Sequence, residues 1–124
     1  MKRIEIGVGS LRSALTQFVE VWRRVEAGEK LPVAKPRVDF GSLSELLGAL
    51  TPKRLELLDA IGTQSGSSVR GLATRLGRDY KNVHGDVAAL EQLGLIERTA
   101  DGTLSAPYDE LVIHAPLKMP KKAA

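Results

Sequence analysis

The chain has 124 residues, a net charge of +3 and no cysteine. This length is enough for one domain with its own hydrophobic core and is short for two ordinary domains. Hydrophobic residues make up 43% of the chain and charged residues 27%, a balance that excludes wholesale disorder. The absence of cysteine excludes disulfides, a thiol nucleophile and a thiolate metal site.

Signals for catalysis and for membranes are weak. The two histidines, His84 and His114, belong to no catalytic motif, so we expect no enzyme activity. The segment GVG at positions 7–9 has Arg12 where a dinucleotide-binding fingerprint has its third glycine, and we expect no cofactor and no metal. No apolar run approaches the roughly 20 residues of a membrane span. The N-terminus shows no secretory signal, so we expect a cytoplasmic protein without a membrane partner.

Residues 1–35 are predicted to form an N-terminal arm. Alternating apolar and charged side chains predict a strand over residues 2–7, and Ser10 caps a predicted helix that Gly28 ends. The apolar residues of this helix form one stripe, which something must cover. We expect a dimer seam made of Leu11, Leu15, Phe18, Trp22 and Val25. Two alternatives stay open. The apolar stripe could equally bind a partner protein, or it could pack over the chain's own core.

The next segment connects this arm to a second set of helices. Residues 29–41 hold two prolines and alternate apolar with polar residues, which predicts an extended linker with a short edge strand. Ser42 caps a short helix, and Thr51-Pro52 opens another that ends near Gly62. The residues of this second helix that we expect to face inward are Leu55, Leu58 and Ile61.

The strongest pattern begins at Ser68, which caps a helix that Gly77 breaks. Asp79 then caps a longer helix that stops at Gly94. Two helices joined by a tight glycine-containing turn form a helix-turn-helix. A hairpin with an Asp-Gly turn at positions 101–102 follows directly, and a hairpin in that place is a wing.

These patterns together predict a mainly α fold with a small β-sheet (α+β). A winged helix-turn-helix domain is expected over residues 36–115, with the strand-helix arm of residues 1–35 before it. Residues 108–115 alternate as a further strand would, and residues 116–124 are expected to form a flexible basic tail.

The helix over residues 79–93 is the predicted DNA-reading helix, because the major groove of B-DNA admits one α-helix and its N-terminal residues contact base edges. Residues 69–84 carry four basic side chains and one acidic one, a balance typical of an element that contacts phosphates. Asparagine can pair with adenine, lysine with guanine or phosphate, and tyrosine with phosphate. The candidate DNA-binding residues are Ser68, Arg70, Arg78, Tyr80, Lys81, Asn82, His84, Gly85, Arg98 and Thr103.

Two structural alternatives accompany this prediction. The helix also fits an ordinary amphipathic core helix whose polar face is only solvated. The hairpin, whose tip carries Asp101, fits equally a pair of strands that closes the core without touching DNA.

The same residues resemble the MarR-like winged helix regulators, in particular a group of small prokaryotic predicted transcriptional regulators. The matches are Thr51-Pro52 with the segment RLELL at 54–58, then SVRGLATRLGRDYKNVHGDVAALEQLGLIER at 68–98, then PYDEL at 107–111. The resemblance implies a dimeric DNA-binding repressor, and members of this group often resemble the antitoxin of a small toxin encoded next door. One departure is Gly85, where relatives tend to carry a basic side chain.

We therefore expect a sequence-specific regulator that binds double-stranded DNA as a homodimer and represses its own gene. A two-fold dimer would place its reading helices about 34 Å apart on a pseudo-palindromic site. The alternative is a winged helix that mainly binds a protein, such as the antitoxin of a toxin-antitoxin pair bound to its toxin.

Overall fold

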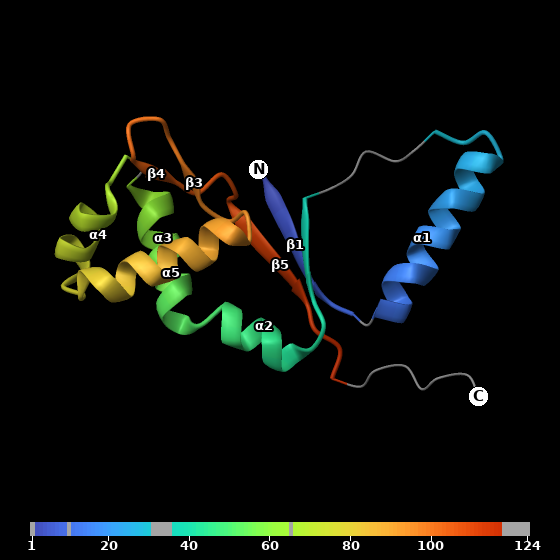
Figure 1. Ribbon diagram of the computed structural model, residues 1–124, viewed down its shortest axis with the longest axis horizontal. Helices are drawn as coiled ribbons and strands as arrows, with labels where there is room; N and C mark the ends of the chain where they lie inside the picture. The colour runs from blue at the N-terminus through green and yellow to red at the C-terminus, as the bar shows by residue number, and fades with distance from the viewer. Residues whose placement is uncertain (1, 10, 31–35, 65, 118–124) are drawn as a thin grey trace. The chain divides into compact units, whose positions relative to one another are not determined.

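A computed structural model describes residues 2–9, 11–30, 36–64 and 66–117, without the side chains of residues 11–13. The fold is α+β and mainly helical, as predicted (Figure 1). Ser10 and the tail residues 118–124 lie outside the described residues. The described helices are α1 (Leu11–Glu26), α2 (Leu43–Ala49), α3 (Pro52–Thr63), α4 (Val69–Leu76) and α5 (Tyr80–Gln92). The described strands are β1 (Arg3–Val8), β2 (Arg37–Phe40), β3 (Glu97–Arg98), β4 (Leu104–Ser105) and β5 (Glu110–His114).

The chain divides into two compact units. We call residues 2–3 with Leu47–Glu110 the helical unit, and Ile4–Leu46 with Leu111–Leu117 the N-terminal unit. The sequence placed a boundary at residue 35, but β2 pairs in parallel with β1 and therefore belongs to the N-terminal unit. The two prolines suggested a boundary within this linker, but the hydrogen bonds between β1 and β2 join the end of the linker to the N-terminal strand. Within the described ranges, none of the helices combines the length and the apolarity that crossing a bilayer requires.

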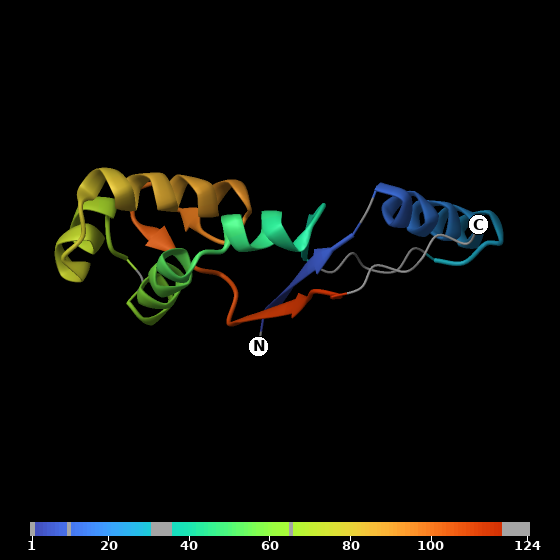
Figure 2. The same ribbon diagram turned by 90° about the horizontal axis from the view of Figure 1, so that it is seen from below.

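The helical unit gathers three helices and a hairpin around one core. The helix α5 packs against α4 and α3, and α3 also contacts β4 (Figures 1 and 2). The strands β3 and β4 are antiparallel, and the backbone of Ser67 bridges to Leu104 beside them. Aliphatic side chains fill the core. Those almost without solvent contact are Leu57, Ile61, Leu72, Val83, Val87, Leu90, Leu95 and Leu104.

Local signals in the sequence set the ends of these helices. The Oγ1 of Thr51 and the Oγ of Ser68 accept backbone N–H groups at 3.3 and 3.0 Å, which caps α3 and α4. The carboxylate of Asp79 caps α5 by accepting the N–H of Asn82 at 3.2 Å. Gly77 closes α4 with φ of 63°, a left-handed conformation that other residues adopt only with strain.

The N-terminal unit contains a three-stranded sheet in the order β2-β1-β5, so the strand expected near residue 2 occupies the centre. Arg37 on β2 donates to Asp39 at 2.8 Å and to Glu5 at 3.3 Å. This ion-pair group lies over Gly7, where an added Cβ would come within 2.5 Å of both the Arg37 and the Asp39 side chain. A glycine at position 7 therefore makes room for the pair.

The inward face of α3 differs from the prediction. Leu57 is fully buried, whereas Leu55 is 38% exposed and Leu58 is half-buried. Ile61 is buried as expected. The tertiary packing rotates the helix so that Leu57 and Ile61, four residues apart, share the buried face. Either rotation is compatible with the apolar pattern, because leucines occupy positions 55, 57 and 58.

Replacing Leu57 with alanine should lower the free energy of unfolding by about 3 kcal/mol, because a cavity replaces a filled site. Leu55→Ala is the matched control and should cost less than about 1 kcal/mol, since its side chain is partly solvated already. Urea denaturation followed by circular dichroism measures both. Equal losses would contradict this orientation of α3.

Candidate functional site

The helices α4 and α5 meet at a tight turn, and α5 turns one side of its surface inward. Val83, Val87 and Leu90 are fully buried. The opposite side is exposed and includes four residues. These are Lys81, Asn82, Gly85 and Ala88. His84, another candidate DNA-binding residue, is exposed as well.

Three predicted site residues form one exposed cluster at the start of α5. The guanidinium carbon of Arg70 lies 4.7 Å from the centre of the Tyr80 ring, and the Tyr80 and His84 rings are 5.8 Å apart. At an exposed site such a cation-π contact contributes about 0.5–1 kcal/mol. The contact brings a cation from α4 beside the first turn of α5. We call Arg70, Tyr80 and His84 the ring cluster.

Arg78 has a different role from the predicted one. Its Nη2 lies 2.8 Å from one carboxylate oxygen of Asp86, and the Nε of Arg54 lies 3.1 Å from the other. Arg54 also donates to the carbonyl of Ala49 at 2.9 Å. The side chains of Arg78 and Asp86 are each only 18% exposed. The charge of Arg78 is therefore paired inside the fold, where it fixes the turn between α4 and α5 to α5 and is not directed toward DNA.

Sequence reasoning missed Arg54 and Asp86. A usable signal was present, because Asp86 is the only acidic residue between the cap Asp79 and Glu91. Burial raises the pKa of the Asp86 carboxyl, but the hydrogen bonds from Arg78 and Arg54 outweigh burial and hold its pKa below the usual value. Asp86 is therefore a structural acceptor for two cations.

Arg75 also uses its charge inside the fold. It donates to the side chain of Gln64, to the Oγ of Ser67 at 3.1 Å and to the carbonyl of Ala60 at 3.3 Å. These bonds tie the end of α4 to the loop after α3. Arg75 is itself exposed, as Arg70 and Lys81 are, but its guanidinium is held by these acceptors.

The hairpin residues also have partners within the fold. Arg98 forms an ion pair of 2.6 Å with Glu91. At the tip, the Oγ1 and the N–H of Thr103 donate to Asp101 at 2.8 and 3.2 Å, and Thr99 bonds to the same carboxylate. Hydrogen bonds from Thr99 and then Thr103 lower the pKa of the Asp101 carboxyl. The tip thus carries a stable negative charge, which favours the core-closing alternative for the hairpin.

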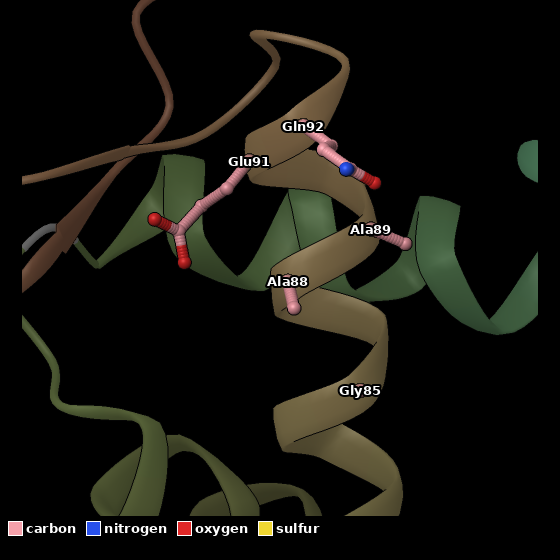
Figure 3. Close-up of a pocket in the computed structure, with 5 residues that line it drawn as sticks. All are labelled: Gly85, Ala88, Ala89, Glu91 and Gln92. Carbon is pink, nitrogen blue, oxygen red and sulfur yellow. The ribbon is translucent and has the colours of Figure 1, made fainter.

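A depression of about 680 Å³ lies along the outer surface of α5 from its second turn onward, and Figure 3 shows the residues that line it. It is lined by Gly85, Ala88, Ala89, Glu91 and Gln92. Gly85 has open space where a Cβ would stand. Among the described residues, no group of three or more histidine, cysteine or acidic side chains could hold a metal ion. The exposed surface of α5 therefore changes from polar and basic at its start to small side chains at Gly85, Ala88 and Ala89, before Glu91 and Gln92.

Asp86→Asn should lower the free energy of unfolding by about 2 kcal/mol at pH 7, because Arg54 and Arg78 each lose a charged acceptor. The pKa of Asp86 is lower in the folded protein than in the unfolded chain, so its contribution is complete above the unfolded value and disappears as pH falls through the folded value. The difference between wild type and variant should therefore narrow from pH 7 to pH 2.

Denaturation by guanidinium chloride at several pH values measures this difference. Asp59→Asn is a suitable control, because Asp59 is an exposed acid on the neighbouring α3. A wild-type advantage over Asp86→Asn that stays constant down to pH 2 would contradict the assigned ion pairs.

The family model HVO_A0114 matches residues 49–113. The match covers α3, α4, α5 and the hairpin, and continues into β5. No curated protein and no solved structure matches the chain. Since the match spans more than half of the 124 residues, the chain belongs to the HVO_A0114 family.

Proposed function

We propose that the chain is a sequence-specific regulator that binds double-stranded DNA and reads the major groove with α5. The observation that carries this proposal is the exposed start of α5, which holds Lys81 and Asn82 beside the ring cluster. The opposite side of the same helix is fully buried, so this surface has a defined orientation. A helix of this kind fits the major groove, with its first turns at the base edges.

Each exposed side chain suits a particular DNA group. Asn82 is suited to a paired contact with adenine, and Lys81 to guanine or a phosphate. Arg70, held beside the Tyr80 ring, is suited to a phosphate on the flank of the groove. Arg78 leaves the proposed site because its charge is paired inside the fold, and Arg98 leaves it because its charge is paired with Glu91 at the surface. Ser68 remains a helix cap, and Thr103 remains part of the hairpin tip.

The regulator is proposed to act in the cytoplasm as a homodimer that represses its own gene. The α4-turn-α5-hairpin order supports the resemblance to MarR-like winged helix proteins. In a two-fold dimer, two α5 helices would contact successive turns of one DNA face, about 34 Å apart. The DNA site would then be a pseudo-palindrome.

A second candidate function is binding of a partner protein, as in an antitoxin bound to its toxin. The observation that favours it is the apolar surface of α1, where Phe18 is 64% and Trp22 57% exposed. A monomeric soluble protein rarely leaves such a surface uncovered. In this alternative DNA binding is secondary or absent.

Lys81→Ala and Asn82→Ala should each weaken binding to DNA from upstream of the protein's own gene by about tenfold, the loss of about 1.4 kcal/mol of contact. Lys81→Ala should also reduce the salt dependence by about one phosphate contact, whereas Asn82→Ala should mainly reduce the preference over scrambled DNA. Fluorescence anisotropy over a salt series measures all three quantities.

Lys30→Ala and Gln17→Ala are matched controls, because both residues are exposed and lie in the N-terminal unit. Both should leave affinity almost unchanged. Unchanged affinity in Lys81→Ala and Asn82→Ala as well would exclude α5 as the reading helix. Weak and equal binding to both DNAs would favour the partner-protein alternative.

Gly85→Arg should strengthen DNA binding several-fold and raise the salt dependence by about one phosphate contact. The site has open space at the Cβ position, and Arg is the better helix former by about 0.5–1 kcal/mol. Gly85→Gln controls for helix propensity without adding charge. The same anisotropy assay measures the DNA affinity of both variants. Equal affinities of the Arg and Gln variants would contradict contact between this part of α5 and DNA.

A further inference from the structure

The helix α1 exposes an apolar surface along most of its length. Leu15, Phe18, Val19, Trp22 and Val25 are between 41% and 64% exposed. The Phe18 and Trp22 rings stack with their centres 6.3 Å apart, so they form one continuous aromatic surface. The indole N–H of Trp22 donates to Glu26 at 2.8 Å, which satisfies its polar group. This surface is therefore ready for an apolar partner without an unsatisfied donor.

The spacing of this surface is that of a coiled coil. The residues Leu11, Leu15, Phe18, Trp22 and Val25 are separated by 4, 3, 4 and 3 positions, which is the a/d pattern of a heptad. Every position on the far side of the helix is polar: Ser13, Thr16, Gln17, Glu20, Arg23 and Arg24. A strict 3.5-residue repeat keeps its seam facing a second helix.

Four of the five seam positions are also arranged symmetrically along the chain. Leu15 and Val25 are equally far from position 20, and so are Phe18 and Trp22. A two-fold interface requires such self-complementarity, because residue i must meet residue j while j meets i. We propose that α1 pairs antiparallel with the α1 of a second copy, with the two-fold axis at residue 20.

In this arrangement Leu15 packs on Val25 of the second copy, and Phe18 packs on its Trp22. Two of the four layers then pair leucine with valine and two pair phenylalanine with tryptophan, so the layers differ less in width than layers of identical residues would. A parallel pair would instead place tryptophan on tryptophan and valine on valine, and the helices could not stay equally close along their length. Even packing therefore favours the antiparallel pair.

Charge favours the same direction. By sequence register, Arg12 and Glu26 occupy equivalent positions flanking the two ends of the seam. An antiparallel copy brings Arg12 of one chain opposite Glu26 of the other, twice per dimer. A parallel copy would place Glu26 opposite Val21. The antiparallel helix dipoles also attract each other.

The length of α1 sets the expected affinity. Its 16 residues span about 24 Å at 1.5 Å per residue. A pair of helices this short buries less than the roughly 800 Å² per partner of a standard interface. We therefore expect a dimer that dissociates in the micromolar range and becomes tighter on DNA, where a shared site holds both copies together. The inference rests on the proposed function only for that last effect.

Cysteine cross-linking of the full chain tests partner and direction together, because the native chain has no cysteine. Leu15→Cys and Val25→Cys should form a mixed disulfide when the two variants are combined and oxidised, at least fivefold above either variant linked to itself. Both sites are exposed, so neither change should unfold the protein. Gln17→Cys with Arg23→Cys is the matched control, because these positions are also symmetric about residue 20 but lie on the polar side of α1.

Self-linked Leu15→Cys as the main product would overturn the antiparallel direction. No linking above the Gln17 and Arg23 control would overturn the pairing itself and leave α1 to a different protein. DNA affinity of the unmodified wild type, measured separately, keeps the two proposals apart. A chain that binds DNA without cross-linking would retain the proposed function and lose this inference.

Dilution supplies a second readout, because Trp22 is the only tryptophan. Its emission should shift to longer wavelength between about 100 μM and 0.1 μM as the seam becomes hydrated, in the concentration range where sedimentation detects dissociation. Trp22→Ala should sediment as a monomer throughout. Emission independent of concentration, or a wild type that remains monomeric, would refute the pairing.

Discussion

One carboxylate sets the direction of the helix on which the proposed function depends. Asp86 on α5 accepts Arg54 from the first turn of α3 at 3.1 Å and Arg78 from the turn before α5 at 2.8 Å. Two cations compensate the cost of its partial burial, which a lone carboxylate would avoid by taking a proton. Because these bonds act on the same helix that buries Val83 and Val87, α5 presents one defined surface to solvent.

Pairing of arginines within the fold also reduces the number of cations that the exposed surface of α5 offers to DNA. Arg75 and Arg78 lie in the basic stretch of the sequence, yet both are bound to acceptors of the fold. The start of α5 therefore offers few cations from one copy, mainly Arg70 and Lys81. Since phosphate contacts dominate affinity for DNA, a regulator with so few of them gains much from a second copy on the same duplex. The proposed DNA surface and the proposed α1 pairing thus support each other physically.

The N-terminal unit combines distant segments into one small sheet. The strands β1 and β2 are separated by α1 along the chain, and β5 comes from beyond the hairpin. Parallel pairing between β1 and β2 requires a long connection, which α1 and the residues after it provide. The connection carries an apolar surface that is mostly exposed, so α1 links the strands and also offers a surface to a partner.

The sequence alone determined the local features. Caps such as Ser68 and Asp79, the stop at Gly94 and the Asp-Gly turn act within a few residues, so they predicted the helices and the hairpin correctly. Tertiary structure decided what depends on distant partners: the place of β2 beside β1, the burial of Leu57 rather than Leu55, and the pairing of Arg78 with Asp86. The sequence does not distinguish an arginine that pairs with a carboxylate eight residues away from an arginine that contacts a DNA phosphate. Only the fold brings that carboxylate within hydrogen-bonding distance.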